Sequence, residues 1–423
     1  MTDLLPVSRT RKATLLAALY LAQGLPFGFF TLALPVLLRD AGLSLKAISA
    51  LSLLSLPWAF KFLWAPVLDH RGTRRGWLLA LQFASLAAAL LLTQVDLASN
   101  YLLLFTAAFL FNLIAASQDV VTDGLAVRLL DARERGLGNG VQVGAYRLGM
   151  ILGGGLLLWL YARTSWSATF LCMAGLLALT IVPVIRMREP PPAADVPHIA
   201  TPQLALAWVQ RALQPGMLAV AGLIFCYRFG DQMVTSLLGP FLVDQGLSLT
   251  TIALMKGAVG STTSFIGALF GGWFVFAAGR RRALLASGLA QAACFSLYIA
   301  AAFGAGGVGL LWAATVLEGV IGTMATVALF TLMMDAAEPE HAGTDYTLLA
   351  SVVVLVSTLA SFTAALLADE LGYGPTFVIG TVAAVLGCLY LVWRLDRRAP
   401  PGRVAEAWRL QPRTREVSLQ SLP

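Results

Sequence analysis

Twelve long apolar runs divide this sequence, and they constrain its fold more than any motif does. Each has 19 to 28 residues, and a helix needs about 20 to cross the hydrocarbon core of a bilayer. Only 12% of the 423 residues are charged, against about 25% in soluble domains. Because backbone groups inside a bilayer must be satisfied within the segment, the runs predict an all-α membrane protein with twelve transmembrane helices. The predicted helices cover residues 13–38, 47–68, 76–94, 100–127, 138–161, 168–186, 216–242, 251–277, 281–302, 309–334, 345–368 and 375–395.

Basic residues gather in alternate loops, which indicates how the chain is oriented. Arginines cluster at 71–75, 128–135, 186–211 and 280–282, and again in the tail. The opposite loops hold only Arg39, Lys46 and Arg163. Since loops rich in Lys and Arg stay in the cytoplasm, both termini are predicted to be cytoplasmic. The net charge of +7 then reflects segments that contact membrane lipids with anionic headgroups, and no nucleic-acid partner is expected.

A Pro-rich stretch at 189–202 divides the chain into two blocks of six predicted helices, because proline cannot continue a helix. The tetrapeptide GLSL follows the first helix of each block, at 42–45 and at 246–249. An even number of spans separates the two GLSL copies, so the halves are predicted to be parallel repeats. Transporters with this symmetry have a solute site between the halves near mid-membrane. The predicted divisions are an N-terminal bundle at 1–188, a cytoplasmic linker at 189–214, a C-terminal bundle at 215–396 and a basic cytoplasmic tail at 397–423.

Ionisable residues inside the predicted helices are candidates for function, because a charge in hydrocarbon is costly. Four cations and four carboxylates fall there, which suggests mutual pairing. They are Lys61, Arg147, Arg228, Lys256, Asp119, Asp123, Asp231 and Glu318. Lys61 and Lys256 lie near enough to helix ends to reach water. Arg228 can pair with Asp231, three residues later on the same helix.

The fourth and fifth predicted helices carry a dense group of polar residues. Asp119 and Asp123 share a helix face, and Gln118 lies beside them. A short loop joins the two helices, so we expect them to run side by side with Asp119 and Arg147 paired at similar depth. Glycines at 136–155 permit close helix packing. Such a group either holds helices together or provides a path for a polar solute.

We assign the polar residues to two roles in transport. The candidates for substrate binding are Gln23, Gln118, Asp119, Tyr146, Arg147 and Arg228. The candidates for proton coupling are Asp119, Asp123, Asp231 and Glu318. A guanidinium can hold a carboxylate or phosphate by two hydrogen bonds, so Arg147 favours an acidic solute. The alternative for Glu318 is a neutral core residue, since burial raises the pKa of a carboxyl.

The sequence carries no signature of an enzyme. It has no P-loop and no Gly-x-Ser-x-Gly motif. Its histidines, His70, His198 and His341, fall in predicted loops. Its four cysteines lie in apolar runs without C-x-x-C spacing, which favours packing over metal binding or disulfides. We therefore expect no enzymatic activity, no metal and no cofactor.

A loop motif carries the first resemblance to a known family. After the second predicted helix, a G-x-x-x-D-x-x-G-x-[RK] spacing is held by Ala65, Asp69, Gly72 and Arg74. The second half repeats part of it with Gly272, Gly279, Arg280 and Arg281, but without the Asp. Ala65 stands where the family prefers Gly, and His70 where it prefers a base. The motif resembles that of the major facilitator superfamily, which implies that fold and a gating loop at Asp69, Gly72, Arg74, Gly279 and Arg280.

Longer matches resemble a narrower group. The segments are FKFLWAPVLD at 60–69, RRGWLLALQ at 74–82, SQD at 117–119 and ERG…GAYRLGM within 134–149. They are similar to the AmpG-type muropeptide permeases, whose group also includes acetyl-CoA transporters. The resemblance implies a symporter in the bacterial inner membrane that imports anhydro-muropeptides with protons, by alternating access, during peptidoglycan recycling.

Two alternatives stay open from the sequence. A transporter of the same fold could carry another acidic solute, such as a CoA ester or a small peptide, since Arg147 suits phosphates and carboxylates alike. A membrane sensor or scaffold without transport would use the same spans, although it would need no carboxylates at mid-membrane.

Overall fold

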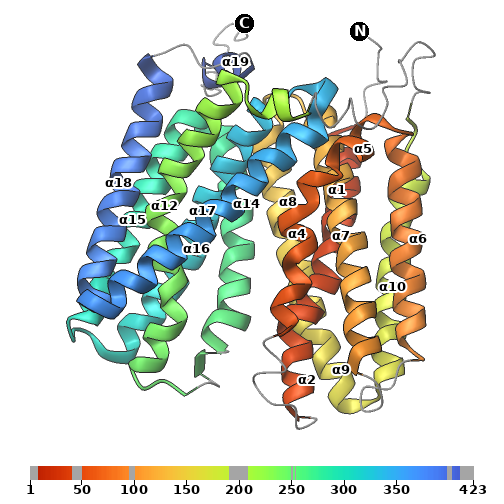
Figure 1. Ribbon diagram of the computed structural model, residues 1–423, viewed down its shortest axis with the longest axis horizontal. Coiled ribbons are helices and arrows are strands. Elements are labelled where there is room, and N and C mark those ends of the chain that lie inside the picture. The colour runs from red at the N-terminus through yellow and green to blue at the C-terminus, as the bar shows by residue number, and fades with distance from the viewer. Residues whose placement is uncertain are drawn as a thin grey trace, which may run out of the picture.

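The protein is a bundle of helices in two halves (Figure 1). The computed structural model describes residues 8–40, 50–94, 101–189, 208–248, 251–252, 254–397 and 403–409. The N-terminal half contains α1 (Arg9–Gly28), η1 (Phe29–Ala33), α2 (Leu34–Asp40), η2 (Ala50–Ser55), α4 (Leu56–Phe60), η3 (Lys61–Leu63), α5 (Ala65–His70), α6 (Arg74–Leu92), α7 (Tyr101–Leu129), α8 (Arg135–Ile151), η4 (Leu152–Leu156), α9 (Leu157–Arg163) and α10 (Trp166–Ile185). The C-terminal half contains α12 (Pro215–Asp244), η5 (Leu254–Val259), α14 (Gly260–Ala278), α15 (Arg280–Ala302), α16 (Gly307–Ala336), η6 (Pro339–His341), α17 (Ala342–Leu371), α18 (Tyr373–Arg397) and α19 (Arg403–Arg409).

Among the described residues, eleven helical segments are long and apolar enough to cross a membrane. They match eleven of the twelve predicted spans, and the all-helical fold in two halves is confirmed. The prediction of one continuous helix at 47–68 is wrong, because the described part consists of the short segments η2, α4, η3 and α5. Pro57 and Pro66 are each the second residue of a new segment, since proline cannot donate the hydrogen bond that would continue the preceding turn. The backbone at Phe60 and Trp64 also departs from α-helical geometry.

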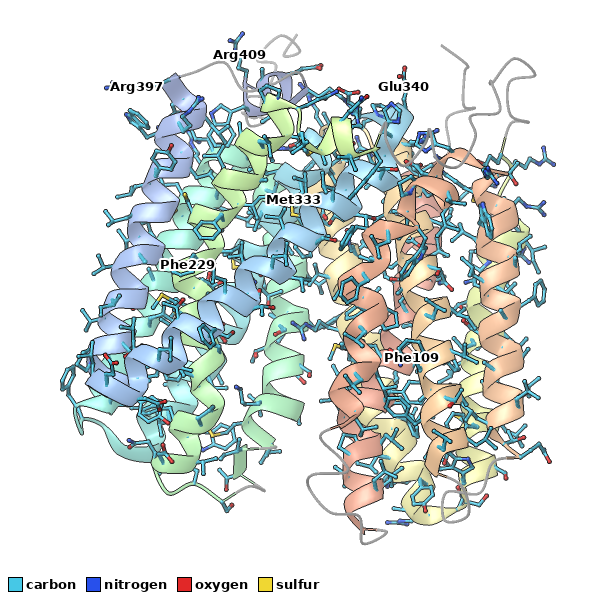
Figure 2. All side chains as sticks on the ribbon, in the orientation of Figure 1. Phe109, Phe229, Met333, Glu340, Arg397 and Arg409 are labelled. Atoms are coloured by element: carbon cyan, nitrogen blue, oxygen red, sulfur yellow. The ribbon has the colours of Figure 1, made fainter. Side chains whose placement is uncertain are left out.

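The two halves join at one end of the bundle. We call this the terminal end, because Arg9 and Arg409 both lie there, and the opposite end the far end (Figures 1 and 2). One apolar cluster at the terminal end contains buried residues of both halves, including Tyr20, Ala126 and Met333. Toward the far end, one cluster belongs to the N-terminal half and another to the C-terminal half. The shared core therefore closes the terminal end.

Helices α8 and α14 make a close contact between the halves. A Cβ atom placed on Gly140 would lie 2.8 Å from the carbonyl oxygen of Ala268 and 2.9 Å from the Cα of Gly272. Such distances require glycine, because any side chain would push the helix backbones apart. This contact joins the halves from the terminal end down to the middle of the bundle.

The first helix is attached to the start of α8 at the terminal end. The carboxylate of Glu134 accepts hydrogen bonds from Lys12 Nζ at 2.7 Å and from Arg9 Nε at 3.1 Å. Burial opposes ionisation of Glu134, but Lys12 and Arg9 outweigh that effect and lower the pKa of the carboxyl. The attachment is thus complete at neutral pH and is lost as the pH falls through this lowered pKa.

The predicted linker and tail are described in part. Residues 190–207 and 410–423 lie outside the described residues. The described part of the tail forms α19, which packs against α15 and α16. Arg403 in α19 donates a hydrogen bond to the carbonyl oxygen of Ala337 at 3.0 Å.

Candidate functional site

The predicted gating loop of the N-terminal half contacts the other half. Asp69 accepts a hydrogen bond from Arg74 Nη2 at 2.8 Å. Its second oxygen accepts from the backbone N–H of Thr344 at 3.0 Å and from the Thr344 hydroxyl at 3.1 Å. These donors lie in the first turn of α17, where backbone N–H groups are free to bind a carboxylate. Gly72 turns the loop with a φ of +70°.

The matching loop of the second half contacts the first half in return. Gly279 has a φ of +82°, and Arg280 donates from Nε to Asp335 at 2.9 Å and also to the carbonyl oxygen of Ala132. Arg135 at the start of α8 donates to the same Asp335 at 2.8 Å. Asp335 is fully buried, so two guanidinium groups from opposite halves share one carboxylate at the terminal end.

The Arg135–Asp335 contact predicts how the terminal end opens. Arg135→Gln should raise the equilibrium constant for separation of the halves at the terminal end by about tenfold or more, since a hydrogen bond to a charged group contributes about 1.5–3 kcal/mol. In this variant Asp335 keeps its ion pair with Arg280, so the buried carboxylate still has one cationic partner. The measurement is the thiol-labelling rate of Ala342→Cys, a buried position in the first turn of α17 at the terminal end, in a chain without its four native cysteines.

Arg281→Gln is the matched control for Arg135→Gln. Arg281 also pairs with an Asp, Asp396, but this pair lies within one half and is largely exposed. Its loss should leave the labelling rate at Ala342→Cys unchanged. Equal rates in Arg135→Gln and the parent would show that the Arg135 contact does not hold the terminal end closed.

A cavity of about 190 Å³ lies between the halves beyond the α8–α14 contact. Arg147 of α8 is the lining residue from the N-terminal half, and the C-terminal half supplies the rest. The lining residues are Arg147, Leu238, Leu242, Lys256, Gly260, Ser261, Ser264, Tyr298, Thr315, Glu318 and Gly319. Ser261 and Ser264 precede Ala268 on α14, and Arg147 follows Gly140 on α8. The cavity therefore lies on the far-end side of the contact, where the two halves diverge (Figure 1).

The cavity contains charged groups of both signs. Arg147, Lys256 and Glu318 all line it, and no ion pair within 4.0 Å joins them in the described structure. Arg147 Nη1 instead contacts the sulfur of Met150 at 3.7 Å. The sequence singled out Arg147 and Glu318 but did not include Lys256 among the site residues. The sequence does contain one indication that Lys256 belongs to the site, because no acidic residue lies one turn away on its own helix to pair with it.

Asp119 does not pair with Arg147, so that prediction is wrong. Asp119 forms a buried ion pair with Lys61, which also overturns the expectation that Lys61 reaches water. The physical reason is helix order: α1 packs against both α7 and α8 and lies between them. Asp119 on α7 and Arg147 on α8 therefore do not face one another, although a short loop joins their helices.

The other polar candidates of the N-terminal half form a buried network rather than part of the cavity lining. Asp123 accepts from the Tyr20 hydroxyl at 2.7 Å and from Gln142 at 3.3 Å. The Gln23 amide donates to the Thr122 hydroxyl at 3.0 Å. In addition, the Gln118 amide donates to the carbonyl oxygen of Leu19 at 3.4 Å.

Tyr146 belongs to an aromatic cluster next in sequence to Arg147. Its ring centroid lies 5.7 Å from that of Phe27 and 6.4 Å from that of Trp58. All three side chains are half-buried. This cluster lies over the Lys61–Asp119 pair, since Lys61 Nζ is 5.8 Å from the Trp58 ring.

The ion pair between Arg228 and Asp231 is present on α12. Their closest side-chain atoms are 2.5 Å apart, and both side chains are largely buried. Gln291 of α15 also donates to Asp231, at 2.6 Å. The pair matches the structural alternative for these two residues, and neither is among the residues that line the cavity.

The histidines do not form a metal site in the part of the chain that is described. His70 and His341, which the sequence placed in loops, instead end the short helices α5 and η6. Their rings meet across the halves with His70 Nε2 and His341 Nδ1 2.8 Å apart, and His198 lies outside the described residues. No group of three or more His, Cys, Asp or Glu residues that could hold a metal occurs among the residues searched.

Comparisons with known proteins place this architecture in context. An uncharacterized protein of Haemophilus influenzae is 31% identical over 91% of this chain and 94% of its own length. The anhydromuropeptide permease of Escherichia coli K12 is 28% identical over 90% of this chain and 79% of its own length. The crystal structure of the transporter FucP in the outward conformation has a TM-score of 0.68 at 15% identity, covering 90% of this chain and 98% of that one.

The family follows from the sequence match and the fold together. The E. coli relative is named as a permease and the FucP structure is that of a transporter, and neither is named as an enzyme. The family profile described as Major Facilitator Superfamily matches residues 16–343 and 220–421. This chain, with its two helical halves and a cavity between them, belongs to the Major Facilitator Superfamily of membrane transporters.

Proposed function

We propose that this protein imports anhydro-muropeptides, the sugar–peptide fragments of the bacterial cell wall, together with protons. The observation that carries the proposal is the cavity between the halves, where the cations Arg147 and Lys256 can receive an acidic solute beside Glu318. The E. coli relative, similar over most of this chain, is named for transport of such a solute. Glu318 supplies a carboxyl that can carry the coupled proton.

The orientation of the protein is part of this proposal. The arginine-rich loops lie at the terminal end, so this end is assigned to the cytoplasm of a bacterial inner membrane, with both termini inside. The cavity then faces outward, and the Asp69 and Asp335 contacts close the cytoplasmic side. The described structure corresponds to the state that receives solute from outside the cell.

Transport by reconstituted protein tests the proposal. Proteoliposomes loaded with unlabelled GlcNAc–anhydro-MurNAc-peptide should take up the labelled compound in counterflow, and an inward proton gradient should drive net accumulation. A protonophore should abolish the accumulation and spare the counterflow. Absence of counterflow from folded protein, or competition by a CoA ester but not by the muropeptide, would contradict the assigned substrate.

A further inference from the structure

Most cations inside the helices form ion pairs with carboxylates among the described residues. Lys61 pairs with Asp119, and Arg228 pairs with Asp231. Arg135 and Arg280 share Asp335. The cavity differs, because its two cations have no ion-pair partner among the described residues and its lining contains one carboxyl group.

The two cations of the cavity come from opposite halves. Arg147 lies on α8 in the N-terminal half, whereas Lys256 lies in η5 of the C-terminal half. The cavity therefore has an excess of positive charge, and each half of the protein contributes one of its two cations. Because like charges repel strongly where little water screens them, the empty site favours separation of the halves at the far end.

The backbone around Lys256 is unusual for a membrane helix. Residues Leu254–Val259 form a π-helical segment, and such segments are frequent at functional sites. The Lys256 amine extends toward α12, where it lies 3.6 Å from the position that a Cβ on Gly239 would occupy. The amine therefore lies against the α12 backbone at the cavity wall.

We propose that Arg147 and Lys256 act together as a clamp for an anionic solute that carries more than one carboxylate. Arg147 binds one carboxylate from the N-terminal half, and Lys256 binds another from the C-terminal half. A bound solute neutralises the two cations and links the halves, so it draws the far end closed. This inference deepens the proposed function, on which it rests, by assigning the solute's acidic groups to two residues.

The first experiment varies the charge of the solute and of the protein together. Binding of the free-acid muropeptide and of the same compound with amidated carboxylates is measured for the parent, Lys256→Met and Lys256→Arg. Lys256→Met should weaken binding of the free acid by about tenfold or more, as expected for loss of a charged hydrogen bond. It should leave binding of the amidated compound unchanged, and Lys256→Arg should retain most of the affinity. Equal losses for both compounds would overturn the clamp.

The second experiment needs no solute and separates the two proposals. Spin labels at Val36→Cys and Val243→Cys, exposed positions near the far ends of α2 and α12, report the separation of the halves in a chain without native cysteines. In empty protein, Lys256→Met should shift the distance distribution toward shorter values, because the repulsion is removed. Arg281→Gln, which removes a surface cation, should cause no shift.

The outcomes distinguish a failed clamp from a failed substrate assignment. The parent could bind neither muropeptide while Lys256→Met still shortens the distance between the spin labels. In that case the proposed substrate is wrong, but the repulsion between the two cations is supported. If the parent binds the muropeptide and Lys256→Met changes neither affinity nor distance, the proposed function survives and the clamp is wrong.

Discussion

Lys61→Met and Asp119→Asn are each expected to destabilise the protein by about 3–5 kcal/mol, because each leaves a buried charge without its partner. The side chains of Lys61 and Asp119 are only 8% and 11% exposed, so water cannot replace the lost partner. The double variant Lys61→Met/Asp119→Leu should recover most of the stability, since apolar residues of similar size often substitute for a buried ion pair. The measurements are thermal unfolding in detergent and the yield of monodisperse protein.

Surface and functional controls complete this experiment. Arg281→Gln breaks an ion pair whose side chains are 52% and 33% exposed, and exposed pairs contribute at most about 1 kcal/mol. Stable single variants would show that the pair does not hold α7 against η3. If the stable double variant still accumulates solute against a gradient, Asp119 is not the residue that couples transport to protons.

The sequence predicts features that depend on local patterns. Apolar length identifies a span without knowledge of its neighbours, which is why eleven predicted spans match continuous helical segments. The broken segment at 50–70 contains two prolines, Pro57 and Pro66, which the sequence shows but which apolar length does not take into account. The Asp69 and Arg280 loops could be found for the same reason, since their spacing is local.

Pairing between helices is not a local property, and the Asp119–Arg147 prediction failed there. The rise per residue gives the depth of a side chain, but it gives neither the direction in which the side chain points nor the order of helices in the bundle. Here α1 intervenes, and Lys61 from a broken segment supplies the partner.

The sequence shows which charges the helices carry, but not how these charges group in space. Four cations and four carboxylates fall inside the predicted helices, but no pattern in the sequence tells which of them lie together in a cavity. The structure places Lys256 with Arg147 and Glu318, three residues from three separate helical segments. Only the packing of the two halves brings these residues together, so sequence spacing could not reveal the group.

Glu318→Gln should abolish uphill accumulation of solute while it leaves exchange nearly unchanged. Glutamine keeps the volume of Glu318 and its capacity for hydrogen bonds, but it cannot take up or release a proton. With an inward gradient of one pH unit and the membrane potential clamped, coupling to one proton permits about tenfold accumulation, since a tenfold ratio corresponds to about 1.4 kcal/mol. The variant should reach a ratio of about one, and its exchange rate should no longer depend on pH over the range in which the parent responds.

The position of Glu318 explains why this residue is chosen over the other carboxylates. Asp119 and Asp231 each have a cation at bonding distance, so a proton would have to displace that cation. Glu318 has no cation at bonding distance, but it lines the cavity beside two cations that an acidic solute can neutralise. Binding of the solute would remove the positive charge that favours the ionised form of Glu318, which links solute binding to protonation. Glu370→Gln, at an exposed carboxylate near the far end of α17, is the matched control and should accumulate solute like the parent. Accumulation equal to that of the parent would remove Glu318 from the coupling mechanism and direct attention to Asp123, which accepts hydrogen bonds from the neutral Tyr20 and Gln142.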